Sequence, residues 1–231
     1  KAHRLARVTW KGRIRKGGGN FFKNCRMLAD ENGYIVLDGI CFGYLGESVQ
    51  LILPEGIKAV AAGAFLGQER ILSLEAPASV LEVGANAFCG CSRLKKIVLP
   101  EQIEELGEDP FAGCDELAAA ELPGIEPSGK KETQLAMILG YCAAPEHYKK
   151  LRAVYEKRAR EEMDSVLRAA VDKGLIASLS YYLKLRLVEK DMFAELLEKA
   201  QKTRQMDMVA ALLEYRRGGL PGNDRFGNFE L

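Results

Sequence analysis

The sequence predicts an α+β protein: a short β-rich solenoid with an N-terminal β-hairpin cap, followed by an all-α C-terminal domain. The first observation is a 23-residue spacing that recurs through the middle of the chain, and the second is a change to helical periodicity after it. The predicted segments are a basic cap (1–27), the solenoid (28–123), a linker (124–132), a helical domain (133–217) and a flexible tail (218–231).

Three kinds of residue keep the 23-residue interval. They are the prolines Pro54, Pro77, Pro100 and Pro123, the phenylalanines Phe65, Phe88 and Phe111, and the glycines Gly67, Gly90 and Gly113. Each unit begins with alternating apolar residues, such as Leu51 and Leu53, which predicts a strand with one buried face. Proline then ends the strand because it has no N–H to donate. No unit buries its apolar groups alone, so the units are expected to stack into one core.

The third unit carries the pattern most completely, through Leu94, Ile97, Leu99, Pro100, Ile103, Leu106, Phe111, Gly113, Cys114 and Leu117. With its counterparts one unit earlier, this pattern closely resembles the BspA-like bacterial leucine-rich repeat. The resemblance implies a leucine-rich-repeat solenoid and says little about activity. Residues 33–46 resemble a degenerate first unit, with Phe42 in register with Phe65. Pro110, Gln68 and the small Ala120 depart from the pattern, as the end units of a capped solenoid often do.

Side chains between the buried strand positions are expected to face outward and to form a ladder four rungs wide, with strands about 4.8 Å apart. Solenoids bind partners through such extended surfaces, so we interpret this face as the site for a protein partner. Its aliphatic members Ile52, Leu72 and Val98 would supply buried area. The candidate partner-binding residues are Gln50, Ile52, Leu72, Ser73, Glu75, Lys95, Lys96, Val98 and Glu121.

Charge is distributed unevenly along the chain, although the net charge is only +1. Residues 1–27 carry +9, residues 28–127 carry −12, and residues 128–231 carry +4. An acidic solenoid between basic ends indicates intramolecular docking or a basic partner. Acidic side chains on the second segment of the repeats and its turns offer a separate site for such a partner: Glu82, Glu101, Glu104, Glu105 and Glu108.

Two interpretations of the basic N-terminus stay open. Residues 7–14 and 21–28 read as strand-like runs around a glycine-rich turn, so they predict a hairpin that covers the first repeat. Trp10, Phe21 and Phe22 lie among the basic residues, a pattern that also suits nucleic-acid binding. No nucleic-acid-binding motif accompanies the charge, which favours the cap.

Helical periodicity begins at residue 133, where Leu135, Ile138, Leu139 and Cys142 share one face. Pro145 is expected to open a long helix that passes residue 167 and ends at Gly174. Shorter helices are expected over residues 176–187, 190–203 and 206–216. Residues 196–213 weakly resemble an ankyrin-type helix–turn–helix, and the apolar stripes of these helices favour a packed core over a ligand groove.

We find no constellation that predicts catalysis, a cofactor or a metal. Cys142 and His147 are too far apart along the chain to share a helical face, as a nucleophile and base would. Cys89 and Cys91 lack the second ligand pair of a zinc site. Residues 124–130 match part of a phosphate-binding loop, but Lys131 stands where a serine or threonine would hold magnesium.

The cysteines, six in all, are interpreted as reduced, which favours a cytoplasmic protein. No apolar run reaches the ~18 residues of a membrane span. The chain begins at Lys1 rather than Met, which leaves a removed leader and an exported or surface form open.

The function predicted from the sequence is therefore non-enzymatic protein binding through the exposed repeat sheet. The alternatives are an exported, adhesin-like surface protein and nucleic-acid binding through the basic N-terminus. The sequence identifies neither the partner nor the oligomeric state.

Overall fold

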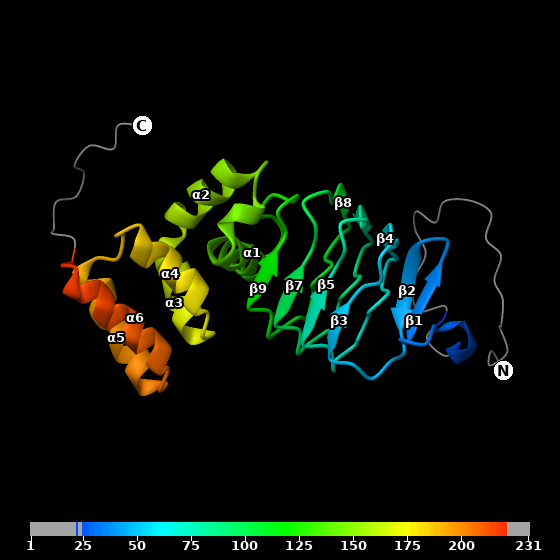
Figure 1. Ribbon diagram of the computed structural model, residues 1–231, viewed down its shortest axis with the longest axis horizontal. Helices are drawn as coiled ribbons and strands as arrows, with labels where there is room; N and C mark the ends of the chain where they lie inside the picture. Colours follow the sequence, from blue (N-terminus) through cyan, green and yellow to red (C-terminus); the bar gives the residue numbers. More distant parts are fainter. Residues whose placement is uncertain (1–21, 23–24, 221–231) are drawn as a thin grey trace.

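The computed structural model describes residue 22 and residues 25–220, which form an elongated molecule (Figure 1). A β-hairpin lies at one end, the stacked repeats form the middle, and the helices continue from the last repeat to the far end. The sequence-based fold class is confirmed: a β-solenoid precedes an all-α region.

The first sheet is parallel and takes one strand from each repeat. Its strands, in order, are β3 (Gln50–Ile52), β5 (Ser73–Glu75), β7 (Lys96–Val98) and β9 (Ala119–Glu121). Leu51 pairs with Leu74, and Leu74 pairs with Ile97, so strand pairing follows the 23-residue interval. Leu51, Leu74 and Ile97 are all buried, as the alternation of apolar residues predicts.

The second sheet combines the N-terminal hairpin with the second segment of each repeat. Its strands, in order, are β1 (Tyr34–Leu37), β2 (Ile40–Tyr44), β4 (Ala59–Val60), β6 (Glu82–Val83) and β8 (Glu105–Leu106). Strands β1 and β2 are antiparallel, and the pairs after them are parallel. The chain therefore winds between two sheets with each repeat.

Aromatic stacking runs along the core of the solenoid. The ring centroids of Phe65 and Phe88 are 5.3 Å apart, and those of Phe88 and Phe111 are 5.8 Å apart. The rings are nearly parallel, with interplanar angles of 18° and 11°. All three phenylalanines are buried, so the 23-residue interval places them in one column as expected.

Phe42 does not join this column, and the predicted register of Phe42 with Phe65 is wrong. Cys41 pairs with Val60, whereas Val60 pairs with Val83 in the next turn. The first pairing therefore spans a shorter stretch of chain than the second and does not keep the repeat interval. The hairpin shortens the first turn, and the Phe42 ring makes an edge contact with Phe22 instead, with centroids 5.3 Å apart.

Most of the predicted N-terminal hairpin, including residues 7–14, lies outside the described residues. Its last part is described, and here the sequence-based expectation of a strand is wrong. Arg26–Leu28 form a short 3₁₀ helix, and the N–H groups of Leu28 and Ala29 close tight turns onto the carbonyls of Cys25 and Arg26. The hairpin that the structure shows at this end of the solenoid is the later one, β1–β2.

Helices make up the rest of the described chain. They are α1 (Lys131–Ala143), the 3₁₀ helix η3 (Pro145–His147), α2 (Arg152–Glu161), α3 (Met163–Asp172), α4 (Ile176–Lys184), α5 (Lys190–Lys202) and α6 (Met206–Arg217). The long helix expected from Pro145 is therefore wrong, because the chain breaks after His147 and again at Glu162. Tyr148 leaves the helical path so that its side chain reaches the last repeat, as described below. The later helices lie where the sequence predicts them.

Helix α1 packs directly on the last strand of the solenoid (Figure 1). A Cβ atom at Gly140 would stand 2.5 Å from the carbonyl oxygen of Ala120, so only glycine permits this approach. The small Ala120, which departs from the repeat pattern, is the other half of this contact. One continuous core of buried residues consequently runs from Tyr34 to Tyr215.

Two helix–turn–helix pairs, α3–α4 and α5–α6, repeat the same local geometry. Leu175 donates its N–H to the carbonyl of Ala170, and Gln205 makes the equivalent bond to Ala200 in the second pair. The predicted helix–turn–helix over residues 196–213 is present. Within the described residues, no helix has the length and apolar character needed to cross a bilayer.

Candidate binding surface

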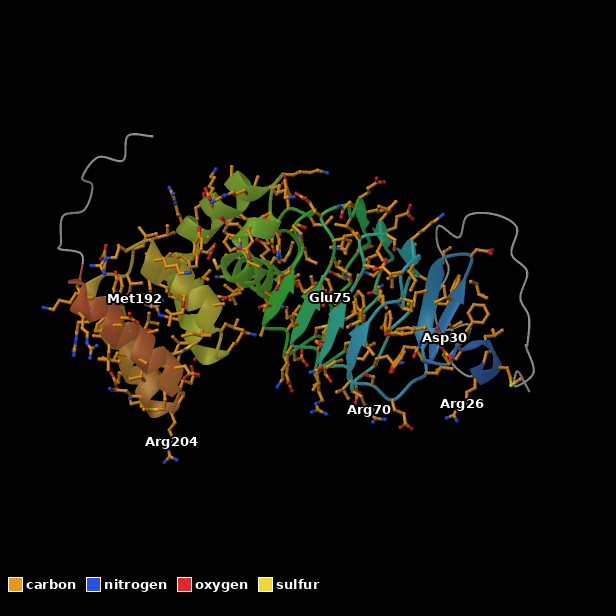
Figure 2. The ribbon with its side chains drawn as sticks, in the orientation of Figure 1. Arg26, Asp30, Arg70, Glu75, Met192 and Arg204 are labelled. Carbon is orange, nitrogen blue, oxygen red and sulfur yellow. The ribbon has the colours of Figure 1, made fainter. Side chains whose placement is uncertain are left out.

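The outward face of the first sheet carries two rows of side chains. One row runs Gln50, Ser73, Lys96 and Ala119, and the other runs Ile52, Glu75, Val98 and Glu121. Figure 2 shows Glu75 over the middle of this sheet and Arg70 beyond the ends of its strands. The parallel register thus brings together the strand positions that the sequence selects as a binding face.

Ile52 is the most prominent apolar group on this face. Its side chain is 72% exposed, which is unusual for isoleucine. Val98 and Leu72 are half-buried. Glu75 lies between Ile52 and Val98 in the row, so the aliphatic groups do not form the unbroken cluster that the sequence suggests. The face is an alternation of aliphatic and charged rungs.

The fourth rung is covered, which corrects two expectations. The sequence predicts that Glu121 is available to a partner, but it is only 5% exposed. Its carboxylate contacts Lys96 Nζ at 2.9 Å and His147 Nδ1 at 3.4 Å. Ala119 is also buried, so the open ladder is three rungs wide rather than four. The sequence does not reveal this because His147 comes from η3, which follows the first helix.

Several candidate residues are engaged only at the surface. Lys95 Nζ lies 3.6 Å from Glu116, and both side chains are largely exposed, so the pair adds little stability. Gln50 and Glu75 are exposed, and Ser73 is half-buried. These side chains can turn toward a partner without breaking a buried contact. Lys96 is the exception, because moving it would remove the cation that lies 2.9 Å from the buried Glu121.

An acidic surface follows the second sheet. Glu82 and Glu105 occupy neighbouring strands in direct register, and both are exposed. Like charges placed opposite each other repel, so a basic partner would relieve this repulsion. Glu101 is half-buried and accepts the N–H of Lys150 at 3.2 Å, so it is partly used within the chain. The predicted acidic surface therefore retains Glu82, Glu104, Glu105 and Glu108 as exposed members.

Cysteines serve the packing of the repeats. The thiol of Cys91 donates to the carbonyl of Phe65 at 3.1 Å, and Cys114 donates to Phe88 at 3.2 Å. Burial raises the pKa of Cys91 to about 11 and that of Cys114 to about 12. A thiol with such a pKa is a poor nucleophile at neutral pH. These cysteines hold successive turns together and offer no reactive thiolate.

Cys142 and His147 point to different partners. The Cys142 thiol donates to the Tyr182 hydroxyl at 3.7 Å, and burial raises its pKa to about 12. His147 contacts Glu121 instead. The two side chains therefore have separate structural roles, and the geometry gives neither a part in nucleophilic catalysis.

A tyrosine hydroxyl group binds a main-chain group at each end of the first sheet, which the sequence did not predict. Tyr34 donates to the carbonyl of Ile52 at 2.9 Å. At the other end, Tyr148 accepts the N–H of Leu122 at 3.1 Å. The repeat interval identifies Leu122 as the last counterpart of Leu53, whose N–H donates to the next turn. The sequence therefore indicates that the Leu122 N–H needs an acceptor, but not that Tyr148 supplies it.

Comparison with known protein families identifies the repeats. Residues 37–128 match the model of the BspA type leucine rich repeat region, with 6 copies. The middle of the chain is thus a BspA-type leucine-rich-repeat solenoid. Proteins built from leucine-rich repeats are in general non-enzymatic binding modules.

Among solved structures, a similar one is the leucine-rich-repeat protein TpLRR of T. pallidum. It is 31% identical over 38% of this chain and 44% of that chain, with a TM-score of 0.35. The chain therefore spans less than half of the length of that protein. The comparison with curated proteins found no similar protein.

Proposed function

We propose that this chain is a non-enzymatic protein-interaction module that binds a partner protein on the open face of strands β3, β5 and β7. The observation that carries the proposal is the 72% exposure of Ile52 on a sheet whose neighbouring positions are also accessible. Repeat solenoids present extended surfaces of this kind to other proteins.

The mechanism is surface complementarity. Burying an isoleucine side chain contributes about 1.5–3 kcal/mol, so Ile52 would serve as the main apolar anchor, at the β3 edge of the face. Glu75 lies next to it and Lys96 on the following strand, and these charges would set the orientation and association rate of the partner. The partner is expected to present an apolar pocket for Ile52, flanked by a basic group for Glu75.

The test is partner capture from native lysate with the wild-type chain and with the double variant Ile52→Asp/Val98→Asp. We expect the double variant to weaken capture of the main partner by roughly a hundredfold, because an aspartate would be buried without a counter-charge. Partners are identified by mass spectrometry, and circular dichroism checks that each variant is folded.

Leu185 and Met206 provide the matched control, since they are exposed apolar residues on the helical region at 45% and 69%. Leu185→Asp/Met206→Asp changes charge and hydrophobicity equally and should leave capture intact. If capture survives the sheet variant, or fails equally in both variants, this sheet is not the site.

We also propose that the protein works in a reducing, cytoplasmic setting. The thiols of Cys91 and Cys114 support this proposal, because each donates a hydrogen bond that requires the reduced form. Fractionation of the full-length protein tests it, and recovery at the cell surface would favour an exported form instead.

A further inference from the structure

The last turn of the solenoid ends differently on its two sides. On the side of the first sheet, helices cover the end. The Leu122 N–H donates to the Tyr148 hydroxyl, and the Tyr155 hydroxyl donates to the carbonyl of Ile125 at 2.8 Å, with the carbonyl of Leu122 3.3 Å away. A tyrosine thus replaces the hydrogen bond that the Leu122 N–H would make to a further turn, and helix α1 covers the strand beside it.

On the other side, the turn after the second sheet has no such replacement among the described residues. In the inner repeats, three N–H groups at alternate positions donate to carbonyls of the next turn. In the second repeat these bonds are Asn86 to Glu108 at 2.9 Å, Phe88 to Pro110 at 2.9 Å, and Gly90 to Ala112 at 2.7 Å. In the first repeat they are Gly63 to Ala85, Phe65 to Ala87 and Gly67 to Cys89.

The equivalent donors of the third repeat are the N–H groups of Asp109, Phe111 and Gly113. No further turn follows, and none of the three has an acceptor within the part of the chain that the structure describes. The carbonyl of Leu106 is left open there in the same way, whereas its counterpart Val83 accepts the N–H of Gly107. The last turn therefore presents main-chain donors and an acceptor at the positions where the inner repeats bind the main chain of the next turn.

These groups line a cleft with a volume of about 760 Å³. Its opposite wall comes from the start of α1 and the loop before it, including Thr133 and Leu135, and from Lys173 after α3. The Lys173 amine donates to the carbonyl of Leu117 at 2.8 Å, which fixes one end of the cleft. A cleft of this size falls within the range of ordinary ligand sites.

The charge of the cleft favours a basic occupant. Four acidic residues line it, against two basic ones: Glu108, Asp109, Asp115 and Glu132, against Lys130 and Lys173. The neighbouring exposed acidic residues, Glu104 and Glu105, extend this negative region along the second sheet.

We propose that this cleft binds an extended, basic segment of a partner protein, whose main chain adds to the solenoid as one more turn. Open β-ladder ends accept an added strand in this way, with main-chain hydrogen bonds for affinity and side chains for specificity. The donors run from Asp109 to Gly113, so the bound segment is of matching length, and its carbonyls accept at alternate positions. This site is separate from the open face of the first sheet.

Amide hydrogen exchange tests the premise. In the free protein, the N–H groups of Asp109, Phe111 and Gly113 should exchange at least about tenfold faster than those of Asn86, Phe88 and Gly90. The two sets occupy equivalent positions in successive turns, so the inner set is the matched control. Equal protection of both sets would mean that the ladder end is closed, and the proposal would fall.

The binding test uses a short labelled peptide of alternating lysine and valine, and the same peptide with glutamate in place of lysine. We expect the lysine peptide to bind the full chain, to shift the amide resonances of Asp109, Phe111 and Gly113 and to slow their exchange. The glutamate peptide should bind at least about tenfold more weakly.

The variant Glu108→Lys/Glu132→Lys should weaken the lysine peptide about tenfold, because it reverses two exposed charges at the cleft. The control Glu55→Lys/Glu69→Lys makes the same change in charge at exposed positions of the first repeat and should bind normally. Equal weakening by both variants, or resonance shifts confined to the first sheet, would overturn the proposal.

Two further measurements separate this site from other occupants and from the sheet. The variant Ile52→Asp/Val98→Asp should bind the lysine peptide as the wild type does, whether or not that face binds its own partner. The second measurement is sedimentation of the wild-type chain and of the variant Glu108→Lys/Glu132→Lys. We expect no self-association of the wild type that is lost in the variant. Such self-association would assign the cleft to a second copy of the chain and refute a partner segment.

Discussion

Replacing Phe88 with alanine removes the central ring of the aromatic column. Phe88 is only 1% exposed, and it stacks on Phe65 at 5.3 Å and on Phe111 at 5.8 Å. Its N–H also donates to the carbonyl of Pro110, although this main-chain bond survives the substitution. The variant therefore isolates the contribution of the side chain at the centre of the solenoid.

The expected loss follows from burial and stacking. A buried phenylalanine truncated to alanine costs about 3–5 kcal/mol, through lost transfer free energy and the cavity that remains. Each aromatic pair contributes about 0.5–1.5 kcal/mol beyond buried area. Phe111 stacks on one ring of the column, whereas Phe88 stacks on two. Phe88→Ala should consequently cost about 0.5–1.5 kcal/mol more than Phe111→Ala.

Urea unfolding followed by circular dichroism measures both variants. With a typical slope of about 2 kcal/mol per molar urea, Phe88→Ala should lower the midpoint by about 2 M. Phe111→Ala serves as the control, since Phe111 is similarly buried at 4% exposure. A midpoint that barely moves, or a larger loss for Phe111→Ala, would refute the account of a stacked column as the centre of stability.

Two other predictions concern the helical cap and the thiols. In an exposed helix, a change from glycine to alanine stabilises by about 1 kcal/mol. Gly140→Ala should instead lower the unfolding midpoint, because the new Cβ atom would lie 2.5 Å from the carbonyl oxygen of Ala120. An unchanged or raised midpoint would contradict this contact. Cys91 has no exposed surface and its pKa is raised by burial to about 11, so it should be alkylated at least about tenfold more slowly at pH 8 than an ordinary thiol, and faster as the pH rises toward 11. Mass spectrometry after timed alkylation measures this rate, with the half-buried Cys89 as an internal comparison, and equal rates for the two thiols would count against it.

The repeats could be predicted because their evidence lies in the order of the residues. Buried positions such as Leu74 and Ile97 recur at the 23-residue interval, and the parallel register pairs these same positions. The outward strand positions follow from the same alternation, which is why the exposure of Ile52 and Glu75 could be predicted. Local periodicity also located α4, α5 and α6, whose apolar stripes and turn residues lie within each segment.

Predictions failed where a residue's surroundings come from elsewhere in the chain. Glu121 occupies an outward strand position, yet His147 and Lys96 cover it. Phe42 looks like a repeat phenylalanine, but the hairpin shortens the first turn and takes this residue out of register with the later repeats. The open donors of Asp109 and Gly113 are also invisible in the sequence, because their lack of partners among the described residues depends on where α1 begins and how it packs.

The sequence by itself determined that the middle of this protein is a stacked solenoid, that helices follow it, and which strand residues face outward. A 23-residue interval of proline, phenylalanine and glycine carries that information locally, and each repeat can bury its apolar groups only against its neighbours. Only the tertiary structure decided how the solenoid ends. Tyr148 and Tyr155 bind main-chain groups on one side of its last turn, whereas the N–H groups from Asp109 to Gly113 have no acceptor among the described residues and line a cleft, because hydrogen-bond satisfaction at an end depends on which distant groups pack there.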